Sequence, residues 1–170
     1  MKLTSSMAAK MLRQLNDEMN TLRVREENTK SFVAALSEDP ESVRPEYDYA
    51  ETQKQITETD AKIRKLKHAL NIFNTTTVIP EFNMTIDEML VYLPQLSRRA
   101  AKLSVMKDEL PKKRENSSYS HSGSSIIDYR YANYDIKQAA DDYAAVSEEL
   151  AKAQTALDYI NSTAEFDFEF

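Results

Sequence analysis

The sequence of 170 residues contains no cysteine and a single glycine. The absence of cysteine excludes disulfide bonds, thiol nucleophiles and thiolate metal sites. One glycine is too few for the glycine-rich loops that hold phosphates or for the nucleophile elbow of the α/β-hydrolases. No apolar run approaches the roughly 18 residues that a membrane-spanning helix requires. We therefore expect a cytoplasmic protein with no membrane segment.

The composition favours long helices. Hydrophobic residues make up 41% of the chain and charged residues 29%, a mix typical of helices with exposed charged faces. The 22 basic and 28 acidic side chains give a net charge of −6, which argues against general nucleic-acid binding. We predict one all-α domain that spans residues 1–170.

Four segments carry apolar residues at alternating steps of three and four, the spacing of helices that pack along one face. The predicted helices span residues 4–36, 47–74, 86–110 and 135–161. Pro40 and Pro45 separate the first two helices, because the residue before a proline avoids the α conformation. Pro94 predicts a kink within the third helix, and Pro111 marks its end.

The expected architecture is a coiled-coil-like bundle of long antiparallel helices. Thr85 and Glu88 form a capping box that opens the third helix. A last helix of about 27 residues is roughly 40 Å long and too slender to bury its own apolar stripe without partners. The bundle can form within one chain or between chains, and we favour a homo-oligomer. The tail, residues 162–170, alternates phenylalanine with acidic residues, so it can add as an extended segment to a neighbouring chain.

The connection between the last two predicted helices, residues 111–134, lacks the apolar periodicity of the four helical segments. Residues 113–120 and 125–132 can be drawn as two short strands around a His-Ser-Gly-Ser sequence. Serine, asparagine and glycine also favour flexible segments. The alternatives are a small β-hairpin or ordered loop, and a flexible loop whose tyrosines cover the end of the bundle.

Several short sequences follow one another along nearly the whole chain. They are Ala69–Asn71, Asn74–Thr76, Met84–Leu90, Arg98–Arg99, Ser124–Ile126 and Ile160–Thr163. Together they resemble the septicolysin-like family of small bacterial and phage helical proteins. The chain departs from the family's pattern before Thr85, where Phe82-Asn83-Met84 replaces an expected glycine. The resemblance implies a helical, oligomeric protein and brings no established reaction.

The sequence gives little support for catalysis. His68 and His121 lack the Glu-x-x-His or His-x-x-x-His spacing that holds a metal. Neighbouring carboxylates such as Asp141-Asp142 and Glu148-Glu149 diverge by about 100° on a helix, so they do not converge on one substrate atom. We predict that the protein is not an enzyme and uses neither a metal nor a cofactor.

Positive charge gathers between Arg98 and Arg114, where seven basic and two acidic residues give a net charge of +5. Arg98 and Arg99 each share a helical face with Lys102, so two cations can approach one phosphate-sized group. Tyrosine rings in the following connection can stack on a base, and Arg130 and Asn133 can read its polar edges. The predicted ligand-binding residues are Arg98, Arg99, Lys102, Lys113, Arg114, Tyr119, Tyr129, Arg130, Tyr131 and Asn133.

The alternative for these cations is pairing with the acidic end of the chain. Asp135 to Phe170 contains nine acidic and two basic residues, a net charge of −7. Cations that pair with these acidic residues would not be available to bind a ligand.

Two functional classes follow from these patterns. The first is a non-enzymatic oligomeric protein that captures or sequesters a small anionic, nucleotide-like ligand. If the chain is encoded by a phage, such a protein would act as a sponge for a nucleotide immune signal. The second is a coiled-coil interaction or scaffold protein that docks a partner through its heptads or its phenylalanine tail.

Overall fold

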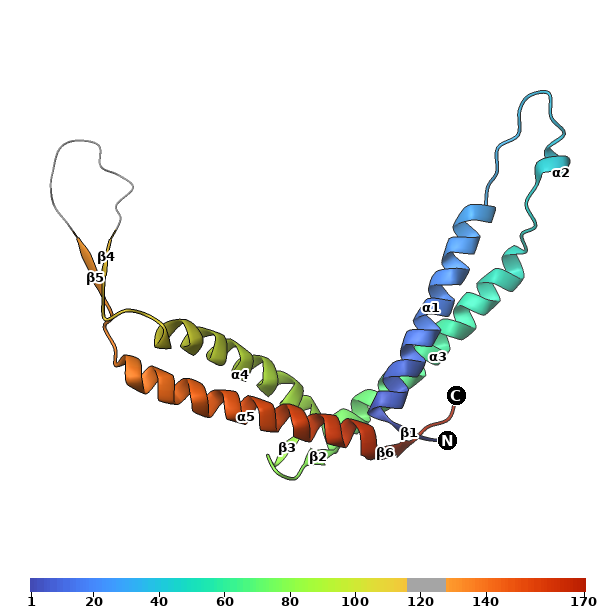
Figure 1. The fold of residues 1–170 in the computed structure, drawn as a ribbon. Coiled ribbons are helices and arrows are strands. Elements are labelled where there is room, and N and C mark those ends of the chain that lie inside the picture. The colour runs from blue at the N-terminus through green and yellow to red at the C-terminus, as the bar shows by residue number, and fades with distance from the viewer. Residues whose placement is uncertain (116–127) are drawn as a thin grey trace, which may run out of the picture. The chain divides into compact units, whose positions relative to one another are not determined.

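The structure is a computed structural model that describes residues 1–115 and 128–170. Its described residues form the helices α1 (Ser5–Thr29), α2 (Pro40–Val43), α3 (Tyr49–Thr76), α4 (Ile86–Lys107) and α5 (Ile136–Thr163). The strands are β1 (Lys2–Thr4), β2 (Val78–Ile79), β3 (Met84–Thr85), β4 (Lys112–Arg114), β5 (Tyr129–Tyr131) and β6 (Glu165–Asp167). They pair as three two-stranded antiparallel sheets, β1–β6, β2–β3 and β4–β5. The all-α class is confirmed, and the connection between the last two helices contains the small β-hairpin (Figure 1).

The described chain divides into two compact units. Unit 1 consists of Met1–Thr77 and Tyr159–Phe170, and unit 2 consists of Val78–Asp158. The sequence predicted one domain over residues 1–170, and the described chain contains two compact units. Unit 1 contains α1 and α3, whereas unit 2 contains α4, the β4–β5 hairpin and most of α5.

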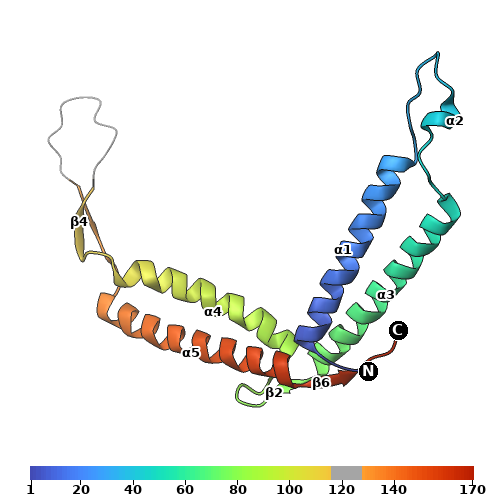
Figure 2. The same ribbon diagram turned by 45° about the vertical axis from the view of Figure 1, so that its right-hand side comes forward.

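In unit 1, α1 and α3 lie side by side and run in opposite directions (Figure 1, Figure 2). Thr4 caps α1 by accepting a hydrogen bond from the backbone N–H of Met7, and Asp48 caps α3 in the same way through Glu51. The core between the helices consists of Leu3, Ala8, Leu15, Met19, Ile63, Leu66 and Phe168. Leu15 and Met19 of α1 and Ile63 and Leu66 of α3 belong to the predicted apolar stripes, whereas Met7 and Tyr49, which continue the same spacing, are 52% and 68% exposed.

The first helix is shorter than predicted. It ends at Thr29 rather than at residue 36, and Val33 and Leu36 are 93% and 108% exposed. Its partner α3 begins at Tyr49, and Glu26, near the end of α1, already contacts Tyr47 through the tyrosine hydroxyl. A longer α1 would therefore extend past the start of α3. Because helical stability in proteins comes mostly from packing, an unsupported extension does not form.

The C-terminal tail is extended, as predicted, but its partner strand belongs to the same chain. Strand β6 pairs with β1, and Phe166 lies opposite Leu3. The ring of Phe166 lies 4.9 Å from that of Phe73, and Phe168 is only 5% exposed. The expectation that the tail adds to a neighbouring chain is therefore wrong for this structure, because the tail completes the core of unit 1.

In unit 2, α4 and α5 lie side by side (Figure 1, Figure 2). The buried residues of α4 are large, namely Ile86, Met89, Leu93, Leu96 and Leu103. Those of α5 are mostly small, namely Ala139, Val146, Ala153, Ala156 and Leu157. Large side chains on one helix and small ones on its neighbour allow close packing. The hydroxyl of Tyr92 donates a hydrogen bond to Glu149, and the ammonium of Lys107 lies 5.1 Å from the centre of the Tyr143 ring.

A capping box opens α4, and a proline follows its end. At the start, the Glu88 backbone N–H donates to the Thr85 hydroxyl over 3.2 Å, and the Thr85 N–H donates to the Glu88 carboxylate over 2.7 Å. The predicted capping box is thereby confirmed. These hydrogen bonds hold the pKa of Glu88 below its ordinary value. The helix stops at Lys107, earlier than the predicted residue 110, and Pro111 follows this stop.

A tight turn precedes α4. It joins β2 to β3, and Asn83 lies within it with a φ of 50°. Asparagine is one of the few residues besides glycine that take this left-handed conformation readily. Asn83 therefore supplies the left-handed conformation that the β2–β3 turn requires.

Among the described residues, no helix combines the length and the apolar character needed to cross a membrane.

Candidate functional site

The β4–β5 hairpin carries most of the predicted ligand-binding residues that the structure describes. Lys112 lies opposite Tyr131, Lys113 opposite Arg130, and Arg114 opposite Tyr129. Backbone hydrogen bonds from Ala132 to Pro111 (3.1 Å) and from Glu115 to Asp128 (2.9 Å) continue the pairing at both ends. Among the described residues, the strands cover 112–114 and 129–131, and they overlap the predicted strands 113–120 and 125–132. Residues 116–127, which include Tyr119 and His121, lie outside the described part of the chain.

One face of the hairpin, here called the tyrosine face, consists of Lys112, Arg114, Tyr129 and Tyr131. Directly opposed residues of an antiparallel pair point to the same side, so the register places these four together. The Lys112 ammonium lies 4.0 Å from the centre of the Tyr129 ring and 5.4 Å from that of Tyr131, a cation–π arrangement. Tyr129 is 45% exposed and Tyr131 is 61% exposed. The tyrosine face thus presents rings and cations together to solvent.

The opposite face, here called the ion-pair face, consists of Lys113, Glu115 and Arg130. Two cations directly opposed across a hairpin repel each other. The Glu115 carboxylate accepts two hydrogen bonds from the Arg130 guanidinium, each 2.8 Å long, and so offsets this repulsion. The hydrogen bonds from Arg130, with the charges of Arg130 and Lys113, hold the pKa of Glu115 below its ordinary value.

A hollow of about 400 Å³ adjoins the ion-pair face. Its lining residues are Glu109, Lys113, Arg114, Glu115 and Arg130. The Tyr134 hydroxyl lies 2.8 Å from the Met106 carbonyl oxygen and 3.0 Å from the Glu109 carboxylate, so it ties the end of α4 to the chain after β5. Burial and the hydrogen bond to Glu109 raise the pKa of Tyr134. With three cations and two carboxylates, the hollow has a small excess of positive charge.

The remaining predicted cations lie elsewhere in unit 2. Arg98, Arg99 and Lys102 are exposed on α4. The rise of about 1.5 Å per residue puts Arg98 roughly 14 Å before the end of the helix at Lys107. The structure therefore separates the predicted ligand-binding residues into a group on α4 and a group on the hairpin. Asn133, just beyond β5, is exposed.

The alternative pairing of these cations with the acidic last helix is not observed among the described residues. Arg98, Arg99 and Lys102 form no ion pair or hydrogen bond with described residues through their side chains. Two carboxylates of α5 have other partners. Glu148 pairs with Lys152 on the same helix, and Glu149 accepts the hydrogen bond from Tyr92.

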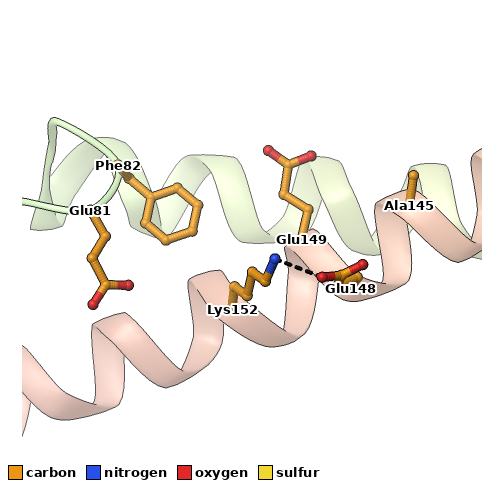
Figure 3. A pocket seen from close by; sticks show the side chains of 6 residues that line it. All are labelled: Glu81, Phe82, Ala145, Glu148, Glu149 and Lys152. Carbon is orange, nitrogen blue, oxygen red and sulfur yellow. Dashed lines mark ion pairs between the residues drawn. The ribbon is translucent and has the colours of Figure 1, made fainter.

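A second hollow of unit 2, of about 430 Å³, was missed by the sequence analysis. Figure 3 shows that Glu81 and Phe82 reach it from the β2–β3 turn, and that its other lining residues, Ala145, Glu148, Glu149 and Lys152, belong to α5. Three carboxylates and one ammonium make it acidic, and the nitrogen of Lys152 lies 2.6 Å from Glu148. The hollow depends on the turn at Asn83, which brings Phe82 toward α5, and helical periodicity alone cannot reveal such a contact.

Two features of the hairpin were also absent from the predicted site. Lys112 was omitted although it lies over both tyrosine rings, and Glu115 was omitted although it neutralises Arg130. The available signal was the sequence Lys-Lys-Arg-Glu itself, because alternation along a strand puts its first and third residues on one face and its second and fourth on the other. In the described ranges, no three histidine or acidic side chains are grouped so that they could hold a metal ion.

The chain matches no known family model and no curated protein sequence. Its structure is similar to that of a functionally unknown conserved protein from Corynebacterium diphtheriae, with a TM-score of 0.61 and 16% sequence identity. The match covers 98% of this chain and 100% of the other. This likeness establishes a shared fold, and the resemblance to the septicolysin-like family stays a prediction.

Proposed function

We propose that the protein binds a small anionic, nucleotide-like ligand at the tyrosine face of the β4–β5 hairpin and captures it without converting it. One observation carries the proposal: the Lys112 ammonium lies over the rings of Tyr129 and Tyr131, both of which remain exposed. A base that stacks on a tyrosine ring brings its attached phosphate close to the ring edge. Lys112 and Arg114 flank the rings on this face, so the two ends of a nucleotide find complementary groups.

The groups on the hairpin have separable tasks. Tyr131, the more exposed ring, offers its surface to the base. Arg114 forms no ion pair with the described residues and also lines the hollow beside the ion-pair face, so it can hold a phosphate in a bidentate manner. Arg130 is held by Glu115, and it therefore contributes positive potential rather than a direct contact.

The ion pair at the hairpin supports capture without turnover. Of the two carboxylates beside the hairpin cations, Glu109 and Glu115, Glu115 has a lowered pKa because it accepts hydrogen bonds from Arg130. A general acid or base works best with a pKa near the working pH, so Glu115 is poorly suited to proton transfer. A protein that only binds a nucleotide signal would lower its free concentration, which is the sequestering role expected from the sequence.

Calorimetric titration with nucleoside mono- and diphosphates, cyclic dinucleotides and ADP-ribose tests this proposal. We expect at least one to bind the wild-type protein, and we expect Arg114→Ala and Tyr131→Ala each to weaken that affinity by about tenfold or more. The matched control is Lys62→Ala, which removes one exposed cation from unit 1 and should leave the affinity unchanged. Inorganic pyrophosphate separates the two contributions, because Tyr131→Ala should not alter its binding. Absence of binding by the whole panel, or equal binding by all the variants, would contradict the proposal.

The alternative function is that of a helical interaction protein, which would dock a partner through its helices or through its phenylalanine tail. Only the first of these two surfaces still has support. Docking through a free phenylalanine tail loses support, because Phe166 and Phe168 pack within unit 1. Docking through helices is favoured by apolar side chains on the outer face of α4, where Val91 and Val105 are 58% and 71% exposed.

A further inference from the structure

The outer face of α4 carries a second row of residues with coiled-coil spacing. Its buried residues occupy one side of the helix, as described above. On the exposed side, alternating steps of three and four residues define a row, here called the α4 row: Val91, Pro94, Arg98, Ala101 and Val105. All five members are exposed. Lys102 follows Arg98 by four residues and adds a second positive charge to the same side.

The outer face of α5 carries a corresponding row. With the same spacing it consists of Asp141, Ala144, Glu148, Ala151 and Thr155, here called the α5 row, and all of them are exposed. Apart from Glu148, the members have short side chains, which allow another helix to approach closely. The exposed side of α4 thus offers two valines and a cation along one row, and the exposed side of α5 offers small residues and two carboxylates.

The two rows have opposite charges that are not matched within the described chain. Arg98 and Lys102 have no ion-pair or hydrogen-bond partner among the described side chains, and neither has Asp141. Glu148 pairs only with Lys152, an exposed residue one turn away on the same helix. Such surface pairs are weak and exchange readily for a better partner. The acidic hollow beside Phe82 shares Glu148 with the α5 row and provides room for a long cationic side chain (Figure 3).

We propose that the α4 row and the α5 row form the contact between copies of this chain. The α4 row of one copy packs against the α5 row of a second, so that Arg98 and Lys102 face Asp141 and Glu148. A second copy is the fitting occupant because one chain carries both halves of the match, with the same spacing and with opposite charge. Val91 and Val105 are covered in this arrangement, which removes exposed apolar surface from water. The contact is independent of ligand binding at the hairpin.

The test uses two charge-reversed variants of the full chain. Variant A, Arg98→Glu with Lys102→Glu, makes both rows acidic. Variant B, Asp141→Lys with Glu148→Lys, makes both rows basic. We expect the wild-type protein to form an oligomer at micromolar concentration in light scattering coupled to size exclusion. Like charges across a contact are strongly unfavourable, so each variant alone should associate at least about 100-fold more weakly.

An equimolar mixture of the two variants is the decisive sample. The acidic α4 row of A then faces the basic α5 row of B, and the native α4 row of B faces the native α5 row of A. The mixture should recover the wild-type mass, and added salt should weaken all of these associations. Lys62→Glu with Lys65→Glu on α3 is the matched control, because it changes the net charge as variant A does and should leave the mass unchanged.

Three results would overturn the proposal: a monomeric wild-type protein at these concentrations, variants that assemble as the wild type does, or a mixture that stays dissociated. Circular dichroism of each variant guards against unfolding, since glutamate and lysine both support helices at these exposed positions. Ligand titration of variants A and B separates this proposal from that for the hairpin, because their affinity for a nucleotide should stay close to that of the wild type.

Discussion

The helix pair of unit 1 and that of unit 2 differ in how their outer surfaces are charged. On the exposed side of α1, bases and acids are mixed, as in Lys10, Arg13, Asp17 and Glu18. On the exposed side of α4, Asp87 and Glu88 lie in the first turn, and Arg98, Arg99 and Lys102 gather farther along the helix, where they have no ion-pair or hydrogen-bond partner among the described residues. Acids and bases that alternate on one helix can pair with each other, whereas a local group of cations leaves a positive potential at the surface. Unit 1 buries its apolar stripes in its own core, whereas unit 2 carries, besides its buried residues, the unpaired cations on which the proposed contact between copies rests.

The largest expected effect is a loss of stability in unit 1 that leaves ligand binding by unit 2 unchanged. Leu66 is fully buried in the core between α1 and α3. Leu66→Ala should lower the free energy of unfolding by about 2 to 5 kcal/mol, because it removes buried apolar volume and leaves a cavity. Urea denaturation followed by circular dichroism measures this change. Below the unfolding transition, nucleotide affinity should stay at the wild-type value, and a large loss of affinity would show that unit 1 supports the hairpin.

A smaller effect concerns the start of α4. Thr85→Ala removes the hydroxyl that accepts a hydrogen bond from Glu88 N–H, and it should cost about 1 kcal/mol of stability. Thr85→Ser keeps the hydroxyl and is the matched control. Thermal unfolding that is equal for both variants would show that the capping box contributes little to the stability of unit 2.

Neutralising Glu115 would make the hairpin more positively charged. Glu115→Gln removes the charge that neutralises Arg130 and leaves two unopposed cations at the ion-pair face. The affinity for a nucleotide should rise by about fivefold, because one negative charge is removed near the phosphate. Lys152→Gln, at the acidic hollow, is the comparison variant and should not alter the affinity. Weaker binding by Glu115→Gln would mean that the ion pair is needed to shape the site.

The smallest expected effect is a dependence of the hairpin on pH. The pKa of Glu115 in the folded protein lies below its ordinary value of 4.5, chiefly because of the hydrogen bonds from Arg130. The ion pair therefore stabilises the hairpin fully above pH 4.5, and this contribution is lost as the pH falls through the lower, folded-state pKa. An NMR titration should show the signals of Tyr129 and Tyr131 changing only below pH 4.5. Changes between pH 5 and 7 would point to a different titrating group.

The sequence predicted the helices well where their pattern is periodic. The bounds of α3, α4 and α5 were correct to within a few residues, and the Thr85–Glu88 capping box was correct in detail. The end of α1 was wrong because Val33 and Leu36 continue the heptad phase past the start of its partner helix. Periodicity reports which face of a helix is apolar, but it does not report how far the neighbouring helix extends.

The candidate site was harder to predict from the sequence than the helices were. Local spacing identified the cations of α4 and of the hairpin, but it could not show that the two groups are separate. The pairing of Arg130 with Glu115 and the position of Lys112 over the tyrosines depend on the register of the hairpin. Register is set by contacts between residues distant in the chain, and the same is true of the tail, whose partner β1 lies at the other end of the sequence.

The most direct test of the central claim is an NMR titration of the labelled protein with a nucleotide that binds. If the tyrosine face is the site, the ring signals of Tyr129 and Tyr131 and the side-chain signals of Lys112 and Arg114 should shift together as the ligand is added. Arg98 and Lys102 on α4 should remain unchanged. Shifts confined to α4, or to the acidic hollow around Glu148 and Glu149, would contradict the account.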